Sequence, residues 1–239
     1  MGDGSLQSRG MTTHRFFVET GTVTADHFPL PESIAYQVTR VLRLRDGDEL
    51  VVLEGDGQEV RCRLAGGELV VLERAPSVGE PRHRLTVAQA LLKGDHLETV
   101  VRQGTEIGVS RFELIVTERC VAREISPARL ARLRSVAREA AEQSERGVVP
   151  EVAAPVGLSE VIGPRSVLLL ERSTGARLSE LPPMERLVIG PEGGFTPDEV
   201  RAAERAAATT ASLGPRILRS ETVSAAAVAV VLSRTGDFA

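Results

Sequence analysis

Two different patterns of hydrophobic and polar positions divide the chain. From His14 to about residue 75, short apolar runs alternate with turn signals such as Asp46-Gly47-Asp48. The run from Glu59 to Leu64 switches between polar and apolar residues, as a half-exposed strand does. Short strands with turns every eight to twelve residues predict a small β-barrel. Its expected elements are strands at 14–18, 49–53, 59–64 and 69–72 and a short helix at 33–40.

After the segment from Pro76 to Pro81, which we interpret as a linker, apolar strands alternate with helical patterns. Gly108 is placed to end one helix, whereas Ser126 and Pro127 are placed to begin the next. Strands are expected at 84–90, 112–116, 167–170 and 210–213, and helices at 96–107, from 127 onward, at 197–208 and at 220–233. This alternation predicts a parallel sheet. The last helix is apolar on nearly all sides, which predicts burial.

The stretch from Leu187 to Glu199 predicts a buried strand, a glycine-rich turn and a helix start, in that order. Thr196 is placed as the N-cap, Pro197 takes the first helical position, and Glu199 completes a capping box. The turn between strand and helix contains Gly190, Gly193 and Gly194. A strand that ends in such a turn is where α/β proteins usually bind a ligand.

The turn favours some ligands over others. It lacks the glycine spacing of dinucleotide-binding folds and the Gly-Lys ending of a phosphate-binding loop. Glu192 lies inside the turn and would repel a phosphate. A neutral or cationic ligand held by main-chain groups therefore fits better. The alternative is a tight strand–helix turn that binds nothing.

Composition narrows the class of protein. The 239 residues are 42% hydrophobic and 26% charged, which is typical of a globular protein with a substantial core. No apolar run approaches the roughly 18 residues of a membrane helix, so we expect a cytoplasmic protein without membrane partners. Met1 to Gly10 are polar and glycine-rich. We interpret them as a leader or an overlong start, with Met11 as a candidate natural first residue.

Charge and metal-ligand residues give weaker signals. The net charge is −4, but residues 81–150 carry 12 basic and 9 acidic residues, a net +3. Residues 1–80 carry 8 arginines and 13 acidic residues, a net −5 that opposes RNA binding unless the arginines cluster on one face. Cys62 and Cys120 lie far apart, and the four histidines lack metal-ligand spacing. We therefore expect no metal site.

Several segments resemble one known family. They are 189–195 (IGPEGGF), 213–222 (LGPRILRSET), 105–109 (TEIGV), 139–146 (EAAEQSER), 15–17 (RFF) and 41–44 (VLRL). Together they resemble the signature of the ribosomal RNA small-subunit methyltransferase E family. The resemblance covers nearly the whole chain from His14. Gln103 stands where a lysine is usual, Tyr36-Gln37 where a histidine is expected, and Ser220 where threonine is commoner.

The resemblance implies a fold and a domain organisation. It implies an α/β fold, with a SPOUT-type trefoil-knotted parallel-sheet domain preceded by a small PUA-like β-barrel. The expected domains are a leader or tag at 1–11, an RNA-binding domain at 12–78 and a methyltransferase domain at 82–239. It also implies a homodimer formed through the knotted domain, with the last helix contributing much of the interface.

The resemblance also implies an activity, which is S-adenosyl-L-methionine-dependent methylation of uracil N3 in 16S ribosomal RNA or the small ribosomal subunit. The implied cofactor-binding residues are Leu170, Glu171, Ile189, Gly190, Pro191, Glu192, Gly193, Gly194, Leu213, Gly214, Ile217, Leu218 and Arg219. The implied RNA-binding residues are Arg15, Arg40, Arg43, Arg129 and Arg132.

Two residues are candidates for the chemistry. Arg219 is expected to stabilise the charge that spreads onto the uracil oxygens, and Glu221 to act as a base or an orienting group. The alternatives are a salt bridge from Arg219 to Glu221, a phosphate contact by Arg219, or a helix-start carboxylate favoured by the helix dipole. Other functions also stay open: a non-catalytic RNA-binding or ribosome-assembly factor, and, less favoured, a SPOUT enzyme acting on transfer RNA.

Overall fold

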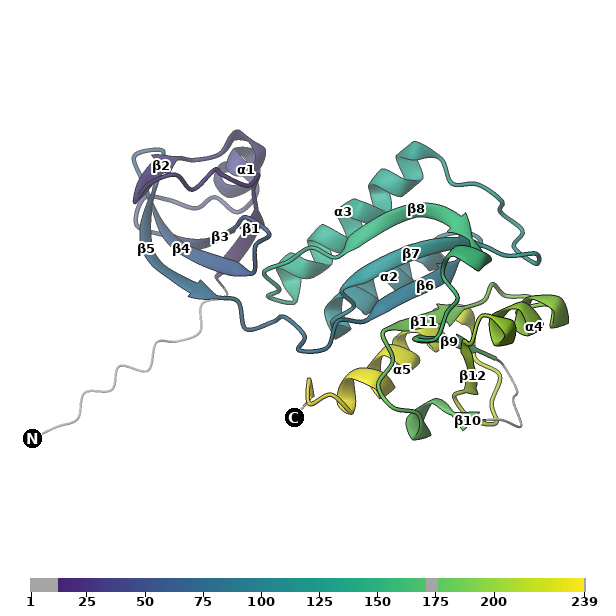
Figure 1. Cartoon of the computed structure of the whole chain (residues 1–239). Coiled ribbons are helices and arrows are strands. Elements are labelled where there is room, and N and C mark those ends of the chain that lie inside the picture. Colours follow the sequence, from purple (N-terminus) through teal and green to yellow (C-terminus); the bar gives the residue numbers. More distant parts are fainter. Residues whose placement is uncertain (1–12, 171–175, 239) are drawn as a thin grey trace, which may run out of the picture. The chain divides into compact units, whose positions relative to one another are not determined.

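The computed structural model describes residues 13–170 and 176–238. The chain divides into two compact units, one ending at Ser77 and the other beginning at Val78 (Figure 1). The division falls inside the segment from Pro76 to Pro81 that the sequence marks as a linker.

The first unit is built on a five-stranded sheet. Its strand order is β1-β3-β4-β5-β2, with β1 parallel to β3 and the other neighbours antiparallel. The strands are β1 (His14–Phe17), β2 (His27–Pro29), β3 (Glu49–Leu53), β4 (Gln58–Ala65) and β5 (Glu68–Pro76). Helix α1 (Glu32–Tyr36) continues directly into a π-helical turn, η1 (Gln37–Val41), where the sequence predicts one short helix.

The alternating pattern of β4 is confirmed by its burial. Val60, Cys62 and Leu64 lie in the core, and the residues between them are exposed. The same core contains Phe16 and Leu50. Burial raises the pKa of the Cys62 thiol to about 11, so the thiol stays protonated near neutral pH and is unreactive. Cys62 is therefore a core residue.

The second unit contains a seven-stranded sheet in which all neighbouring strands are parallel, as predicted. The order is β10-β12-β9-β11-β6-β7-β8. The strands are β6 (Thr86–Ala90), β7 (Arg111–Val116), β8 (Glu151–Gly157), β9 (Ser166–Leu169), β10 (Ala176–Arg177), β11 (Arg186–Ile189) and β12 (Thr209–Ser212). The late strand β11 thus lies between β6 and β9, so the chain returns into the middle of its own sheet.

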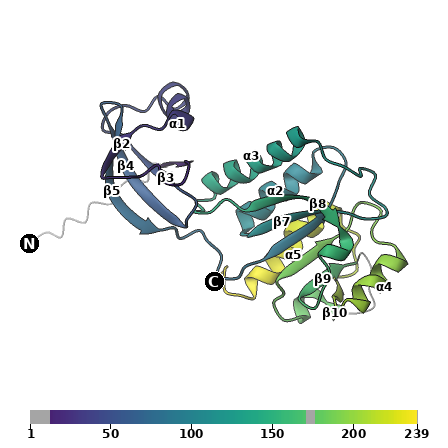
Figure 2. The same cartoon turned by 45° about the horizontal axis from the view of Figure 1, so that its top comes forward.

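Among the described residues of this unit, four α-helices accompany the sheet. They are α2 (His96–Ile107), α3 (Pro127–Gln143), α4 (Pro197–Arg205) and α5 (Ser220–Ser233), with short 3-10 turns η2 (Leu158–Glu160) and η3 (Leu178–Glu180). Helix α2 packs against both α3 and α5, whereas α4 packs against β12 and η2. Figures 1 and 2 show α2 and α3 side by side along β6, β7 and β8.

The helix ends follow the signals read from the sequence. Gly108 ends α2 in a left-handed conformation with φ of +117°, which glycine adopts without strain. The Ser126 side chain accepts a hydrogen bond from the main chain of Arg129 and caps α3. Thr196 and Glu199 form the predicted capping box at the start of α4.

Helix α5 is less buried than its sequence predicts. Ala227, Val228 and Leu232 lie in the core, but Val223 and Val230 are only partly covered. The expected burial is therefore confirmed for most of the helix, whereas Val223 and Val230 pack against the core but remain partly exposed. An apolar helix face of this kind is suited to contact with another molecule.

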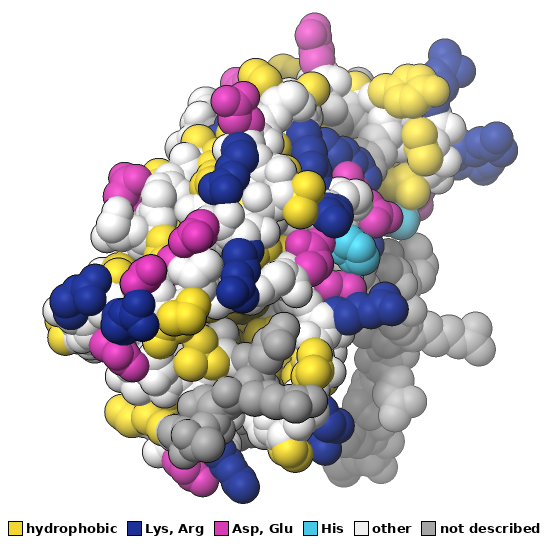
Figure 3. Space-filling model, turned by 90° about the vertical axis from the view of Figure 1, so that its right-hand side faces the viewer, with side chains coloured by type: hydrophobic (Ala, Val, Ile, Leu, Met, Phe, Trp, Pro, Cys, Tyr) yellow, Lys and Arg dark blue, Asp and Glu magenta, His cyan; other side chains and the backbone are white. Residues whose placement is uncertain are grey.

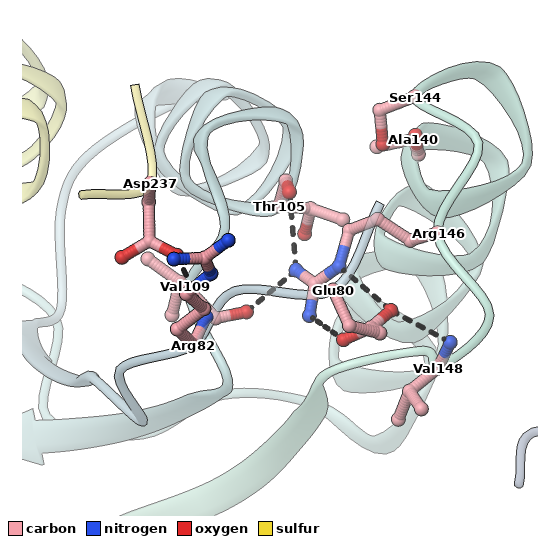
Figure 4. Close-up of polar contacts among 9 residues, drawn as sticks. All are labelled: Glu80, Arg82, Thr105, Val109, Ala140, Ser144, Arg146, Val148 and Asp237. Carbon is pink, nitrogen blue, oxygen red and sulfur yellow. Dashed lines mark hydrogen bonds and ion pairs between the residues drawn. The ribbon is translucent and has the colours of Figure 1, made fainter. Parts of the chain in front are cut away.

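A buried arginine fastens the start of this unit to its interior (Figure 4). Arg146 follows α3 and is only 2% exposed. Its guanidinium pairs with Glu80 at 3.0 Å and donates to the main-chain oxygens of Thr105 and Val109, at 3.1 and 2.7 Å. Glu80 also accepts from the main chain of Val148 at 3.0 Å. The arginine of the 139–146 segment is thus a structural residue, which joins α2, the end of α3 and the linker.

Candidate active site

The carboxyl ends of the parallel strands meet at one edge of the sheet and enclose a cavity. The loops after β6, β9, β11 and β12 all leave this edge, because neighbouring strands run in the same direction. The cavity has a volume of about 650 Å³. Figure 3 looks onto this side of the molecule and shows acidic, basic and apolar side chains interleaved, without one dominant charge.

Most residues expected to bind a ligand line this one cavity. They are Leu170, Ile189, Gly190, Pro191, Glu192, Gly193, Gly194, Leu213, Ile217, Leu218 and Arg219, together with Glu221. Gly214 is not among the lining residues but has a φ of +110° in the same loop. Glu171 lies outside the described residues. The two turns that were expected to converge therefore face each other across the same space.

The glycines of the first turn are needed for packing and for backbone conformation. A Cβ at Gly190 would lie 3.1 Å from the ring of Phe195, and one at Gly193 would lie 3.3 Å from the Cβ of Arg119. Gly194 has a φ of +65°, which costs other residues about 1–2 kcal/mol. The turn is thus a compact structure that presents its main chain to the cavity.

A buried polar network holds this turn against the start of α5. The Gln89 side chain, on β6, donates to the hydroxyl of Ser220 at 3.0 Å. That hydroxyl donates in turn to the main-chain oxygen of Gly190 at 2.7 Å. Both polar side chains are almost fully buried. Since buried hydrogen bonds are costly to break, the network fixes the two loops relative to each other.

The charged residues of the cavity differ from the expected pairing. Glu221, in the first turn of α5, lies 3.3 Å from Nδ1 of His96 rather than beside Arg219. Arg219 is exposed, and its side chain has no hydrogen bond or ion pair within the described part of the chain. The alternative of an Arg219–Glu221 salt bridge is therefore not found, and the guanidinium is available to a ligand.

Several cavity residues were not predicted from the sequence, and two of them, His96 and Arg119, come from loops far upstream of the two predicted turns. His96 begins α2 directly after the loop that follows β6. Arg119 lies in the loop after β7 and donates to the main-chain oxygen of Gly193 at 2.8 Å. Both follow the carboxyl ends of strands in the same parallel sheet. Polar residues after every predicted strand, including the strands far upstream, are therefore the signal that points to them.

Three of the five arginines expected to bind RNA have partners within the protein. These partners are Glu59 for Arg15, the main-chain oxygens of Leu92 and Gly94 for Arg129, and Glu98 and Glu139 for Arg132. Such contacts leave less of each guanidinium available to a phosphate than a free side chain would have.

The other two arginines lie at the end of η1 and in the segment that follows it. Arg40, Arg43 and the nearby Arg45 are exposed, and their side chains make no ion pair with any residue the structure describes. Tyr36, 72% exposed, precedes them on the same segment. Arg43 has a φ of +55°, an uncommon conformation outside glycine. We call Tyr36, Arg40, Arg43 and Arg45 the η1 surface.

The two arginines of β4 are paired with carboxylates. Arg61 contacts both Glu49 and Glu73, and Arg63 contacts Glu49. Hydrogen bonds from Arg63 and Arg61 lower the pKa of Glu49, so this carboxylate is charged at neutral pH. The net negative charge of the unit is thus compatible with one basic surface, because part of the acid is used in these pairs.

Neither a metal-binding cluster nor a membrane-spanning helix is found in the part of the chain that the structure describes. Among residues 13–170 and 176–238, no group of three or more His, Cys, Asp or Glu side chains could hold a metal ion. Within the same ranges, every helix is too short or too polar to cross a bilayer.

Comparison with known proteins gives consistent matches. Residues 79–232 match the RNA methyltransferase domain family, and residues 38–72 match the RNA methyltransferase PUA domain family. Ribosomal RNA small subunit methyltransferase E of Synechocystis sp. is 37% identical, over 82% of this chain and 69% of its own length. The protein of the same name from Mycobacterium tuberculosis is 32% identical over 92% of each chain.

Solved structures agree with these relatives. Ribosomal RNA small subunit methyltransferase E from Neisseria gonorrhoeae, bound to S-adenosyl methionine, superimposes with a TM-score of 0.85 and 26% identity, covering 93% of this chain and 98% of that one. A putative methyltransferase from Legionella pneumophila, in complex with the same cofactor, gives 0.81 and 26%, covering 94% and 98%. The expected fold, a SPOUT-type knotted α/β domain preceded by a PUA-like domain, is confirmed. The chain belongs to the ribosomal RNA small subunit methyltransferase E family.

Proposed function

We propose that this protein transfers the methyl group of S-adenosyl-L-methionine to N3 of a uracil in small-subunit (16S) ribosomal RNA, in the cytoplasm. The observation that supports the proposal most directly is the shared cavity of the two turns, Gly190 to Gly194 and Leu213 to Arg219. We assign methyl transfer to residues 82–239 and RNA binding to residues 12–78. A protein that only bound RNA would have no use for both turns.

The cavity fits this cofactor by size and chemistry. Its volume lies within the roughly 300–1,000 Å³ of small-molecule sites. Leu170, Ile189 and Leu218 supply apolar walls for an adenine, and the glycine turn offers main-chain groups. Glu192 suits a cation and would repel a phosphate, and the cofactor has a sulfonium and no phosphate. When bound, it supplies an electrophilic methyl group.

The residues of the protein must prepare the uracil for this methyl group. N3 of uracil carries a proton at neutral pH, so a base must remove it, and the resulting charge spreads onto O2 and O4. Arg219 lines the cavity, and its guanidinium has no partner among the described residues, which suits it to stabilise that charge. Holding N3 in line with the methyl group supplies much of the remaining rate.

The η1 surface is our candidate for RNA binding by the first unit. Its three arginines can contact phosphates, and the exposed ring of Tyr36 can stack on an unpaired base. Arg40→Ala combined with Arg43→Ala should therefore weaken binding to a ribosomal RNA fragment and reduce the dependence of affinity on salt by about one unit of slope per lost phosphate contact. Filter binding across a salt series measures both quantities.

Arg61→Ala is the matched control for this double variant. It removes the same kind of charge from the same unit, but from a side chain already paired with Glu49 and Glu73. An equal loss of affinity in the control and the double variant would show that only net charge matters and would exclude the η1 surface.

We also propose a homodimer formed through the knotted domain. The partly covered side of α5, with Val223 and Val230, is an apolar face that a second copy of the chain would bury. Val223 also lines the cavity, which would place the interface beside the active site. Val230→Glu should therefore convert a dimer into a monomer in analytical ultracentrifugation. Val78→Glu, at a position 89% exposed, is the control and should leave the mass unchanged.

The function itself is tested by mapping N3-methyluridine in 16S ribosomal RNA from cells with and without the protein. A methylated uridine that disappears in the deletion strain and returns with the purified enzyme and S-adenosyl-L-methionine supports the proposal. Calorimetry with S-adenosyl-L-methionine distinguishes the enzyme from a non-catalytic assembly factor, because the assembly factor would bind RNA without binding the cofactor. An unchanged methylation map would refute the proposal.

A further inference from the structure

A histidine–carboxylate pair stands at the edge of the cavity. Nδ1 of His96 lies 3.3 Å from Oε1 of Glu221. The His96 side chain is 40% exposed and that of Glu221 is 16% exposed, so the carboxylate is the more enclosed partner. Both line the cavity together with Arg219. When a carboxylate accepts from Nδ1 of a neutral imidazole, Nε2 keeps its lone pair and can accept a proton.

The loop that carries His96 is held from two sides. Arg129 donates from α3 to the main-chain oxygens of Gly94 and Leu92. On the other side, the main chain of Lys93 donates to the Glu192 carboxylate at 3.1 Å. The loop is thereby tied both to α3 and to the glycine turn. This gives Arg129 a role that the charge pattern alone did not suggest, namely to fix the position of His96.

Glu221 is held equally well. It lies in the first turn of α5, directly after Ser220, whose hydroxyl is bonded to the main-chain oxygen of Gly190. The two members of the pair thus come from the ends of different loops, and each loop is linked to the glycine turn. Positions fixed by such networks are typical of catalytic groups, because small misplacements are costly in rate.

The other charged groups around the cavity are poorer proton acceptors. The cations cannot accept a proton at all; they are Arg119, Arg216 and Arg219, with Lys93 beside the His96 loop. The carboxylates are Glu192, which accepts from the main chain of Lys93, and Glu221, which faces His96. The Asp95 carboxyl belongs to the same loop, but Asp95 is not a lining residue. An imidazole is ordinarily a stronger base than a carboxylate.

We infer that His96 is the base that removes the proton from uracil N3, and that Glu221 is the positioning residue that orients its ring. This inference rests on the proposed function. Nε2 of neutral His96 accepts the N3 proton, and the electron pair of the broken N–H bond forms the new N3–CH3 bond. The methyl–sulfur electron pair stays on sulfur, which becomes a neutral thioether, and the positive charge passes to the imidazolium. Atoms and charge balance without another reactant.

The test combines kinetics with a measurement that needs no turnover. Single-turnover methylation of ribosomal RNA is measured for the wild type and His96→Gln as a function of pH, with cofactor affinity from calorimetry. The imidazole nitrogens of His96 are followed by NMR, in the wild type and in Glu221→Ala. His83→Gln is the matched control, because His83 contacts the main chain of Met184 and does not line the cavity.

We expect His96→Gln to bind the cofactor normally and to transfer methyl at least about a hundredfold more slowly at neutral pH. The deficit should shrink as pH rises, because hydroxide replaces the missing base. The wild-type rate should fall at the pH where the His96 ring titrates by NMR. Neutral His96 should carry its proton on Nδ1, and Glu221→Ala should move it to Nε2.

Different failures point to different errors. An active wild type with His96→Gln of similar rate and the same pH profile overturns the role of His96 alone. A wild type that binds ribosomal RNA and cofactor but never methylates overturns the proposed function, and this inference with it. Loss of rate in His96→Gln that persists unchanged at high pH assigns His96 a structural role and likewise rejects the base.

Discussion

Arg146→Ala should lower the free energy of unfolding of the second unit by about 3–5 kcal/mol. The substitution removes a guanidinium that is only 2% exposed and leaves the Glu80 carboxylate without its charged partner. It also leaves the main-chain oxygens of Thr105 and Val109 without their hydrogen-bond donor in the interior. Because each lost partner of a buried polar group adds its own desolvation cost, the penalties accumulate. Urea denaturation followed by circular dichroism measures the change.

A surface arginine provides the comparison. Arg165 pairs with Glu185, but their side chains are 76% and 53% exposed, so Arg165→Ala should cost at most about 1 kcal/mol. Arg146→Lys is informative as well, since an ammonium cannot reproduce the fork that contacts Glu80 and two main-chain oxygens. If Arg146→Ala and Arg165→Ala proved equally mild, the buried cluster would not hold the linker to the domain.

The helices of the second unit could be predicted closely because their ends are encoded locally. Gly108 ends α2, Ser126 begins α3, and Thr196 with Glu199 begins α4, each within one turn of the residues it satisfies. The sequence contains no equally local signal for the strands β2, β8 and β10. β2 and β10 are very short, and the β8 segment contains Pro155, which opposes a strand reading. All three form only because neighbouring strands accept their hydrogen bonds.

The strand order could not be predicted from the sequence, for a related reason. The apolar run of β11 does not indicate that this strand inserts between β6 and β9, because buried parallel strands all have a similar apolar composition. The fold could be anticipated only through resemblance to a family. Once the order is known, it explains why turns far apart in sequence share one cavity.

The candidate site was predictable where it depends on the main chain and less so where it depends on charge. The two glycine-containing turns can be recognised from their composition, and both line the cavity. The partner of an arginine, in contrast, is set by residues distant in sequence. Arg129 turned out to be bonded to the loop before α2, and Glu221 to face His96 rather than Arg219. Charge patterns therefore indicate which residues are basic but not which of them are free.

Arg219→Ala should slow single-turnover methyl transfer by roughly a hundredfold to a thousandfold, the usual effect of removing one group that stabilises a developing oxyanion. Its guanidinium lines the cavity at the start of α5 and has no partner in the described structure, so its charge is available to the uracil oxygens. Cofactor affinity, measured by calorimetry, should change far less than the rate, because the main chain of the two turns is left intact. Rapid-quench kinetics with excess enzyme gives the rate.

Two comparisons make this result specific to Arg219. Arg205→Ala removes an exposed arginine from the last turn of α4, outside the cavity lining, and should leave the transfer rate unchanged. Arg219→Lys keeps the charge but loses the planar fork, so it should recover only part of the rate if both uracil oxygens or their geometry matter. An unchanged transfer rate in Arg219→Ala would remove this residue from the chemistry. A rate that fell at low cofactor concentration but recovered at saturation would make it a binding residue, since a uniform loss of binding raises the bound ground state and the transition state equally.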